Sequence, residues 1–141
     1  MTAPSAVAVA GIFIWLGMVL GISFIETPLR FRAPGVTLQL GLAIGRLVFR
    51  ALNAAELVLG VVVLIALSFE PPPVRVELPL FAAVVALAVQ LLVVRPSLTR
   101  RSAVVLGGAK GGRSRAHYVY IGLEVIKALA LLLSGIMLLA A

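Results

Sequence analysis

Charge is scarce in this chain of 141 residues, and that scarcity excludes most classes of protein. Only 12% of the residues are charged, about half the roughly 25% of an ordinary soluble domain. At the same time 62% are hydrophobic and the mean hydropathy is +1.20. A single domain of this length has no core large enough to bury so many apolar side chains, and a disordered chain has too few of them. The composition therefore predicts an integral membrane protein.

Cysteine is absent altogether. Without a thiol the chain has no disulfide exchange, no thiolate metal site and no thiol nucleophile, which excludes redox chemistry of the vitamin-K-reductase type. Lysine and arginine are absent from residues 1–10. A cleavable signal peptide needs a positively charged start and a short apolar core. We therefore expect the long apolar run that follows to be an uncleaved membrane anchor.

Four apolar stretches are long enough to cross a bilayer, which takes about 20 helical residues. Prolines mark several of their ends: Pro28 disfavours helix at Thr27, Pro71–Pro73 end the second stretch, and Pro79 suits the first turn of the third. Short connections between successive spans are typical of an antiparallel bundle. The predicted fold is therefore all-α, one integral membrane antiparallel four-helix bundle with spans at about 6–27, 46–69, 78–94 and 117–140.

The basic residues set the orientation of these spans. The formal net charge of +7 would suit nucleic acid, but ten of the twelve basic residues lie in two segments that connect apolar stretches. They are Arg30, Arg32, Arg46, Arg50, Arg95, Arg100, Arg101, Lys110, Arg113 and Arg115. Connecting segments rich in lysine and arginine face the cytoplasm. We therefore expect a multi-pass protein of the inner (plasma) membrane with both termini on the extracytoplasmic side, and lipid rather than nucleic acid as its partner.

The second span contains two polar residues, Asn53 and Glu56. Glu56 follows Arg46 by ten residues, which places it about 15 Å deeper along a helix and near the middle of the membrane. An ionised and unpaired carboxylate would be very costly there. Glu56 must therefore hold a proton or pair with a cation from another helix, and Asn53, one turn earlier, can hydrogen-bond it or a ligand.

The fourth span offers that cation. His117, Tyr120, Glu124 and Lys127 fall on one helical stripe, and Glu124 and Lys127 can pair at i, i+3. Across the bundle we expect a contact between Glu56 and Lys127 or between Glu124 and Arg50. Near the inner end of the first span, Glu26 and Arg30 would pair if the helix continues past Pro28.

Two interpretations of these charges remain open. In one, a buried network of ion pairs holds the helices in register. In the other, a polar cavity opens to the cytoplasm, its carboxylates carry protons, and His117 passes protons in at the inner mouth. The third span offers only Gln90, so we expect it to face lipid or to pack. The residues predicted to bind ligand or protons are Glu26, Arg46, Arg50, Asn53, Glu56, His117, Tyr120, Glu124 and Lys127, with Trp15 as a further wall.

No metal or other cofactor is predicted. The Glu-x-x-His motif of di-iron bundles is missing, and positive side chains in the same region oppose a bound metal ion. With one histidine in the chain, bis-histidine haem is excluded, whereas haem with His117 as a single axial ligand stays open, as does quinone. The glycine-rich run 107–112 lacks the phosphate-loop motif. Gly17-x-x-x-Gly21 is a motif of close helix packing.

Several strings of the sequence carry a resemblance to known proteins. They are Trp15–Gly17, Phe24–Phe31, Gly45–Glu56, Arg95–Leu98 and the stripe from His117 to Lys127. Together they resemble small bacterial four-span inner-membrane proteins of undefined function, and their layout is similar to that of the copper-resistance-D-like and transmembrane-protein-205-like groups. The resemblance implies four spans and supplies no mechanism. The copper-resistance group relies on histidines that this chain lacks, so a copper role is not implied.

These observations predict proton-coupled transport of a small anionic solute or ion at a cytoplasm-facing site within the membrane. Arg46 and Arg50 would bind the anion, and Glu56 and Glu124 would carry protons. A chain this short is expected to need a homo-oligomer or another membrane protein to form a complete pathway. Two other functions remain open. One is a non-catalytic accessory or assembly subunit of a larger membrane complex, and the other is a membrane redox protein that binds haem or quinone. Neither transport nor the accessory role is enzymatic.

Overall fold

The computed structural model describes residues 1–94 and 115–141, and 88% of these residues are helical with no strand among them. Four of the helical stretches are long and apolar enough to cross a membrane: Ala3–Arg30, Leu38–Phe69, Val74–Leu92 and Tyr118–Ala140. The elements in order are α1 (Ala3–Val19), the π-helical segment η1 (Leu20–Glu26), α2 (Thr27–Arg30), α3 (Leu38–Phe69), α4 (Val74–Val89), the π-helical segment η2 (Gln90–Val94) and α6 (Arg115–Ala140).

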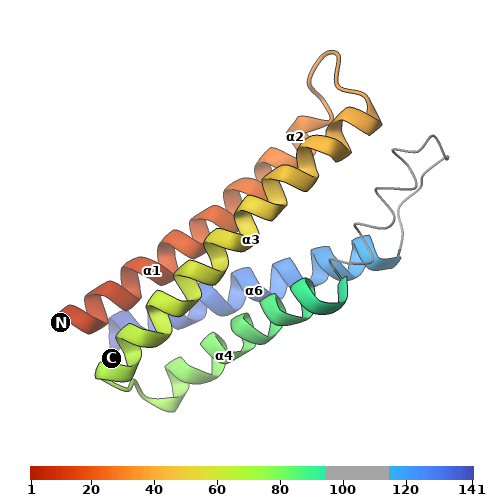
Figure 1. Ribbon diagram of the computed structural model, residues 1–141. Helices are drawn as coiled ribbons and strands as arrows, with labels where there is room; N and C mark the ends of the chain where they lie inside the picture. Colours follow the sequence, from red (N-terminus) through yellow and green to blue (C-terminus); the bar gives the residue numbers. More distant parts are fainter. Residues whose placement is uncertain (95–114) are drawn as a thin grey trace.

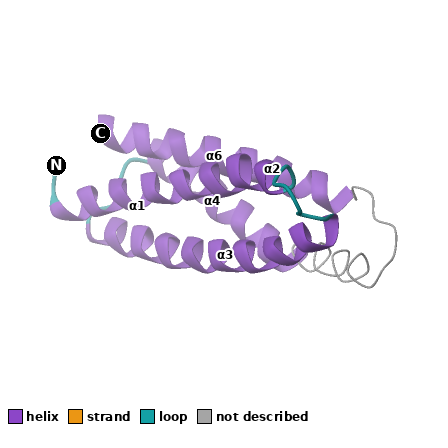
Figure 2. Cartoon of the chain, turned by 90° about the horizontal axis from the view of Figure 1, so that it is seen from above, coloured by secondary structure: helices purple, strands orange, loops and turns teal. Residues whose placement is uncertain are grey.

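The long helices lie side by side, and the N- and C-termini are at the same end of the assembly (Figure 1). α1 packs against both α3 and α6, and α4 packs against α6; Figure 2 shows the same assembly from above. The core between them is apolar and includes Ile12, Trp15, Val63 and Leu131, all fully buried. Large apolar side chains also cover the outer faces, as Phe81 does with 68% of its surface exposed. Such faces suit contact with lipid tails rather than with water.

The sequence predicted that the first helix ends near Pro28. Instead, the helix that begins as α1 continues through η1 and α2 to Arg30. In η1 the turns are wider than in an α-helix, and the N–H of Thr27 bonds to the carbonyl of Ile22, five residues back. A wider turn relieves the clash that a proline ring makes with the preceding turn of an α-helix. Because the helix continues, Glu26 and Arg30 form the expected pair, with Nε to Oε1 at 2.9 Å and Nη2 to Oε2 at 2.5 Å.

Two other helices begin earlier than the predicted spans. α3 begins at Leu38, where the Thr37 hydroxyl accepts a hydrogen bond from the Leu40 N–H at 3.1 Å. A threonine in this position satisfies one of the free N–H groups of the first turn. α4 begins at Val74, directly after the proline run, so Pro79 lies inside the helix and not in its first turn. Both helices therefore begin outside the most apolar residues, and α3 does so with a side-chain cap.

Close packing between α1 and α3 occurs at Gly11 and not at the Gly17-x-x-x-Gly21 motif. A Cβ atom at Gly11 would lie 2.7 Å from Cγ2 of Val63, whereas one at Gly17 or Gly21 would meet no atom within 4 Å. Val63 is fully buried and β-branched, so it cannot move aside easily. The motif did not predict the position of close packing, because glycine spacing alone does not show which side of a helix contacts a neighbour.

We expect Gly11→Ala to lower the free energy of unfolding by about 1–3 kcal/mol, because the added methyl group overpacks the contact with Val63. The measurement is a denaturant titration of the purified protein in detergent, followed by circular dichroism. Gly17→Ala in the same helix is the matched control and is expected to be neutral or slightly stabilising. Equal effects of the two substitutions would contradict this packing.

Candidate functional site

Four polar side chains from three helical segments meet in the interior of the assembly. We call them the charged centre: Glu56 on α3, Gln90 at the start of η2, and Glu124 and Lys127 on α6. Glu56, Gln90 and Lys127 are 0% exposed and Glu124 is 1% exposed. A buried charge is stable only when it is paired and hydrogen-bonded, so the contacts of each member decide what the centre can do.

Lys127 uses all three of its N–H donors within the centre. Its Nζ lies 2.5 Å from Oε1 of Glu56, 2.5 Å from Oε1 of Glu124 and 2.7 Å from Oε1 of Gln90. An ammonium group has three donors and no acceptor. Lys127 is therefore saturated, and its one positive charge is shared between two carboxylates.

The amide of Gln90 completes the connection between α4 and α6. Its Nε2 donates to Oε1 of Glu124 at 2.7 Å and to the backbone carbonyl of Tyr120 at 3.4 Å, while its Oε1 accepts from Lys127. An amide offers one acceptor and two N–H donors, and all three groups are used here. Gln90 therefore links the acid and the base of α6 to a neighbouring helix.

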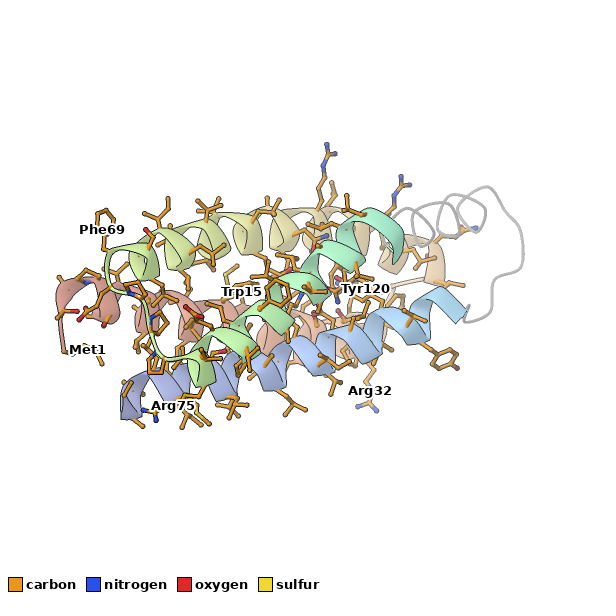
Figure 3. All side chains as sticks on the ribbon, turned by 90° about the horizontal axis from the view of Figure 1, so that it is seen from below. Met1, Trp15, Arg32, Phe69, Arg75 and Tyr120 are labelled. Carbon is orange, nitrogen blue, oxygen red and sulfur yellow. The ribbon has the colours of Figure 1, made fainter. Side chains whose placement is uncertain are left out.

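The first helix contributes two uncharged donors, one to each carboxylate. The indole Nε1 of Trp15 donates to Oε1 of Glu56 at 2.9 Å, and the hydroxyl of Ser23 donates to Oε2 of Glu124 at 2.5 Å. Gly60 on α3 faces the Trp15 ring, and a Cβ atom there would lie 3.7 Å from the ring, in ordinary van der Waals contact. Figure 3 shows Trp15 and Tyr120 in the middle of the assembly, whereas Arg32 and Arg75 lie at its edges.

The charges of the centre do not balance. Two carboxylates and one ammonium sum to one net negative charge when all three are ionised. Two more cations were expected nearby, but Arg46 and Arg50 on α3 are both exposed. A net charge enclosed by apolar helices is costly. One added positive charge would balance the sum.

Oε2 of Glu56 and Oδ1 of Asn53 are buried beside the centre and have no hydrogen-bond partner among the described residues. Asn53 is 6% exposed and precedes Glu56 by three residues on α3. Residues three apart on a helix are neighbours on its surface. Two unused acceptors thus lie on the same side of α3, next to a centre that lacks one positive charge.

The structure brings together some of the predicted site residues and separates others. The expected contact between Glu56 and Lys127 is confirmed, as is the pair of Glu124 with Lys127. Tyr120 is buried nearby, with its ring edge-on to Phe49 at 5.7 Å between centroids. The side chain of His117 lies outside the described part of the structure, although its backbone belongs to α6.

The alternative contact between Glu124 and Arg50 is not formed, because Glu124 pairs with Lys127. That Arg46 and Arg50 line the site with Glu56 stays a prediction. Six positions along a helix turn the chain by about 600°, so Arg50 points about 120° away from Glu56. Both arginines are exposed. Glu26 is also apart from the centre, because it pairs with Arg30 and keeps 39% of its side chain exposed.

Sequence reasoning missed Ser23 and undervalued Gln90. The third span was expected to serve packing or face lipid, whereas Gln90 is fully buried and touches both charged members of α6. A signal for Gln90 was present, because it is the only strongly polar side chain in an otherwise apolar stretch, and polar groups buried in lipid require partners. Ser23 gave no such signal, since serine is common in membrane helices.

No group of three or more histidine, cysteine or acidic side chains that could hold a metal ion occurs in the described segments 1–94 and 115–141. The chain was also compared with known proteins. No family model, curated protein or solved structure matches it. The function is therefore inferred from the chemistry of the charged centre.

Proposed function

We propose that this chain is a multi-pass protein of the inner membrane, an antiparallel four-helix bundle whose termini are both extracytoplasmic. Four apolar helices and the common position of the two termini support this arrangement (Figure 1). Away from the termini, Arg30 ends α2, Arg32 follows it, and Arg46 and Arg50 lie in the first half of α3. The positive-inside rule favours the cytoplasm for this part of the chain.

Within this frame we propose proton-coupled transport of a small solute, with the charged centre as its proton-binding site. The observation that carries the proposal is the sharing of one fully buried ammonium, Lys127, by two buried carboxylates, Glu56 and Glu124. Because the ionised centre has one excess negative charge, binding a proton neutralises it and losing the proton recharges it. A change of charge inside the membrane changes the relative stability of helix arrangements, which is what coupling requires.

The two π-helical segments favour movement over a purely rigid role. Ser23 belongs to η1 and Gln90 belongs to η2, and both donate a hydrogen bond to Glu124. π-helical turns are rare in proteins, and those that do occur are often found at functional sites. Both irregular segments therefore bond to the same carboxylate. A change in the hydrogen bonds of this carboxylate would alter the structure of α1 and α4 together.

The coupled solute does not bind as an anion at the charged centre itself, because Arg46 and Arg50, the two arginines expected to bind an anion, are exposed. Side chains fill the interior of the four helices around Trp15, Val63 and Leu131. A complete solute pathway therefore requires a second copy of the chain or another membrane protein, and a homo-oligomer is the simplest arrangement.

The test is proton flux into liposomes that contain the purified protein and a trapped pH-sensitive dye. We expect the wild type to dissipate an imposed pH gradient and Glu56→Gln to reduce the rate to that of protein-free liposomes, because the variant centre is neutral without an added proton. Glu26→Gln is the matched control, since it removes the same charge from a half-exposed ion pair, and it should retain flux. Flux that is unchanged in Glu56→Gln, or absent from the wild type, would reject the proposal.

A second candidate function is that of a non-catalytic accessory subunit. The complete burial of the centre favours it, because hydrogen bonds from Trp15, Ser23 and Gln90 join all four long helices through Glu56 and Glu124. Such a network fixes the rotation of each helix. In the liposome test this function is indicated by a wild type without flux whose fold still depends on Glu56.

A further inference from the structure

The hydrogen bonds of the charged centre leave two acceptors unused. Both carboxylate oxygens of Glu124 accept, one from Lys127 and Gln90 and the other from Ser23. Oε1 of Glu56 accepts from Lys127 and Trp15. Oε2 of Glu56 and Oδ1 of Asn53 are both buried without a hydrogen-bond partner among the described residues.

One proton resolves both the charge and the hydrogen bonds. We infer that Oε2 of Glu56 carries a proton and donates it in a hydrogen bond to Oδ1 of Asn53. The O–H group turns one of the two unused acceptors into a donor for the other, and the added charge brings the sum for Glu56, Glu124 and Lys127 to zero. This inference rests on the proposed proton-binding function and deepens it, because it names the atom that holds the proton and the residue that positions it.

Helix geometry agrees with this assignment. Asn53 and Glu56 are three residues apart, which turns them only about 60° from each other around α3. In a helix the Cα–Cβ bonds tilt toward the N-terminus, so the longer side chain of Glu56 lies over the turn that contains Asn53. Burial of both residues, at 0% and 6% exposure, keeps water from competing for the bond.

The same reasoning excludes Glu124 as the carrier of the proton. A proton on Glu124 would balance the charge, but it would leave Oε2 of Glu56 and Oδ1 of Asn53 buried without a partner. A buried acceptor without a partner costs free energy that a proton on Glu56 avoids. Among described residues, the titratable groups near Glu56 are Lys127, Glu124 and Tyr120, all on α6; α1 and η2 present only Trp15, Ser23 and Gln90, which do not titrate near neutral pH.

The composition makes the proton directly observable. All five acidic residues are glutamates, and a protonated carboxyl has a C=O stretching band well separated from the bands of carboxylates in the infrared spectrum. We expect wild-type protein at neutral pH to show one protonated carboxyl, and Glu56→Gln to lose the band. Glu26→Gln is the control and should retain it.

Two further variants locate the proton. Asn53→Leu removes the acceptor and should shift the band to higher frequency, because the C=O bond of a carboxyl strengthens when its O–H is not hydrogen-bonded. Ser23→Ala removes the partner of Glu124 and should leave the band unchanged. A band that shifts in Ser23→Ala would place the proton on Glu124 and overturn the inference, and this arm decides the question even if Asn53→Leu does not fold.

The salt used in the measurement provides the last control. The band should have the same intensity in choline chloride and in sodium chloride. A band that is present in choline but absent in sodium would mean that a metal cation occupies the two oxygens, and the absence of a band in both would also overturn the inference. Glu56-dependent flux together with no protonated band would reject this inference alone, whereas a Glu56 band without flux would reject the proposed transport alone.

Discussion

Lys127→Met is expected to be the most damaging single substitution in the chain. Lys127 is 0% exposed and is the shared partner of two buried carboxylates. Removing one member of a buried ion pair costs about 3–5 kcal/mol, because the remaining charge is left uncompensated. Because an ordinary protein is stable by only about 5–15 kcal/mol, we expect a strongly lowered thermal unfolding midpoint in detergent, followed by circular dichroism, and little folded protein in the membrane fraction.

Two comparisons separate the loss of the ion pair from the loss of a positive charge in general. Arg75→Met removes an exposed cation and should leave the unfolding midpoint close to that of the wild type. The double variant Lys127→Met, Glu124→Gln also removes the carboxylate of Glu124 that Lys127 paired with, and it should recover part of the lost stability. A Lys127→Met protein as stable as the wild type would show that the charged centre does not exist as described.

Trp15→Ala is expected to have the second largest effect. Trp15 is fully buried in the core between α1 and α3, lies against Gly60, and donates a hydrogen bond to Glu56. Truncating a buried aromatic side chain costs about 3–5 kcal/mol through lost packing and the cavity that remains. Here the substitution also removes one of the two donors of Oε1 of Glu56. The free energy of unfolding, measured by denaturant titration in detergent, should fall by an amount in this range.

Trp15→Phe and Phe81→Ala divide this effect into its parts. Phenylalanine keeps most of the packing but loses the indole N–H, so Trp15→Phe should cost about 0.5–1.5 kcal/mol, as expected when one hydrogen bond is lost. Phe81 has 68% of its surface exposed, and Phe81→Ala should cost much less than Trp15→Ala. Equal losses for Trp15→Ala and Phe81→Ala would mean that Trp15 is not a core residue.

The two π-helical segments suggest why the centre depends on more than pairs of charges. Glu124 receives its hydrogen bonds from Ser23 in η1 and from Gln90 in η2. Each segment follows a regular α-helix: η1 follows α1, and η2 follows α4. A carboxylate held by two such segments connects its own hydrogen bonding to the shape of α1 and α4.

Local features of this protein could be predicted from the sequence. Long apolar runs predict helical spans because every backbone N–H and C=O must be bonded within the membrane. Pairs such as Glu26 with Arg30 and Glu124 with Lys127 follow from the fixed spacing of a helix, whose geometry is the same in every protein. The position of Glu56 along its helix followed from a count of residues and a constant rise.

Only the tertiary structure decided which faces of the helices meet. It turned Glu56 and Asn53 inward and Arg50 outward, and it placed Gln90 and Ser23 against Glu124. The rotation of a helix about its axis depends on contacts with residues far away in the chain, such as that between Gly11 and Val63. The sequence of one helix considered alone does not contain this information. The number of helices and their local ion pairs were therefore set by the sequence of each segment, whereas the shared charge and the two unused oxygens arose only from their packing.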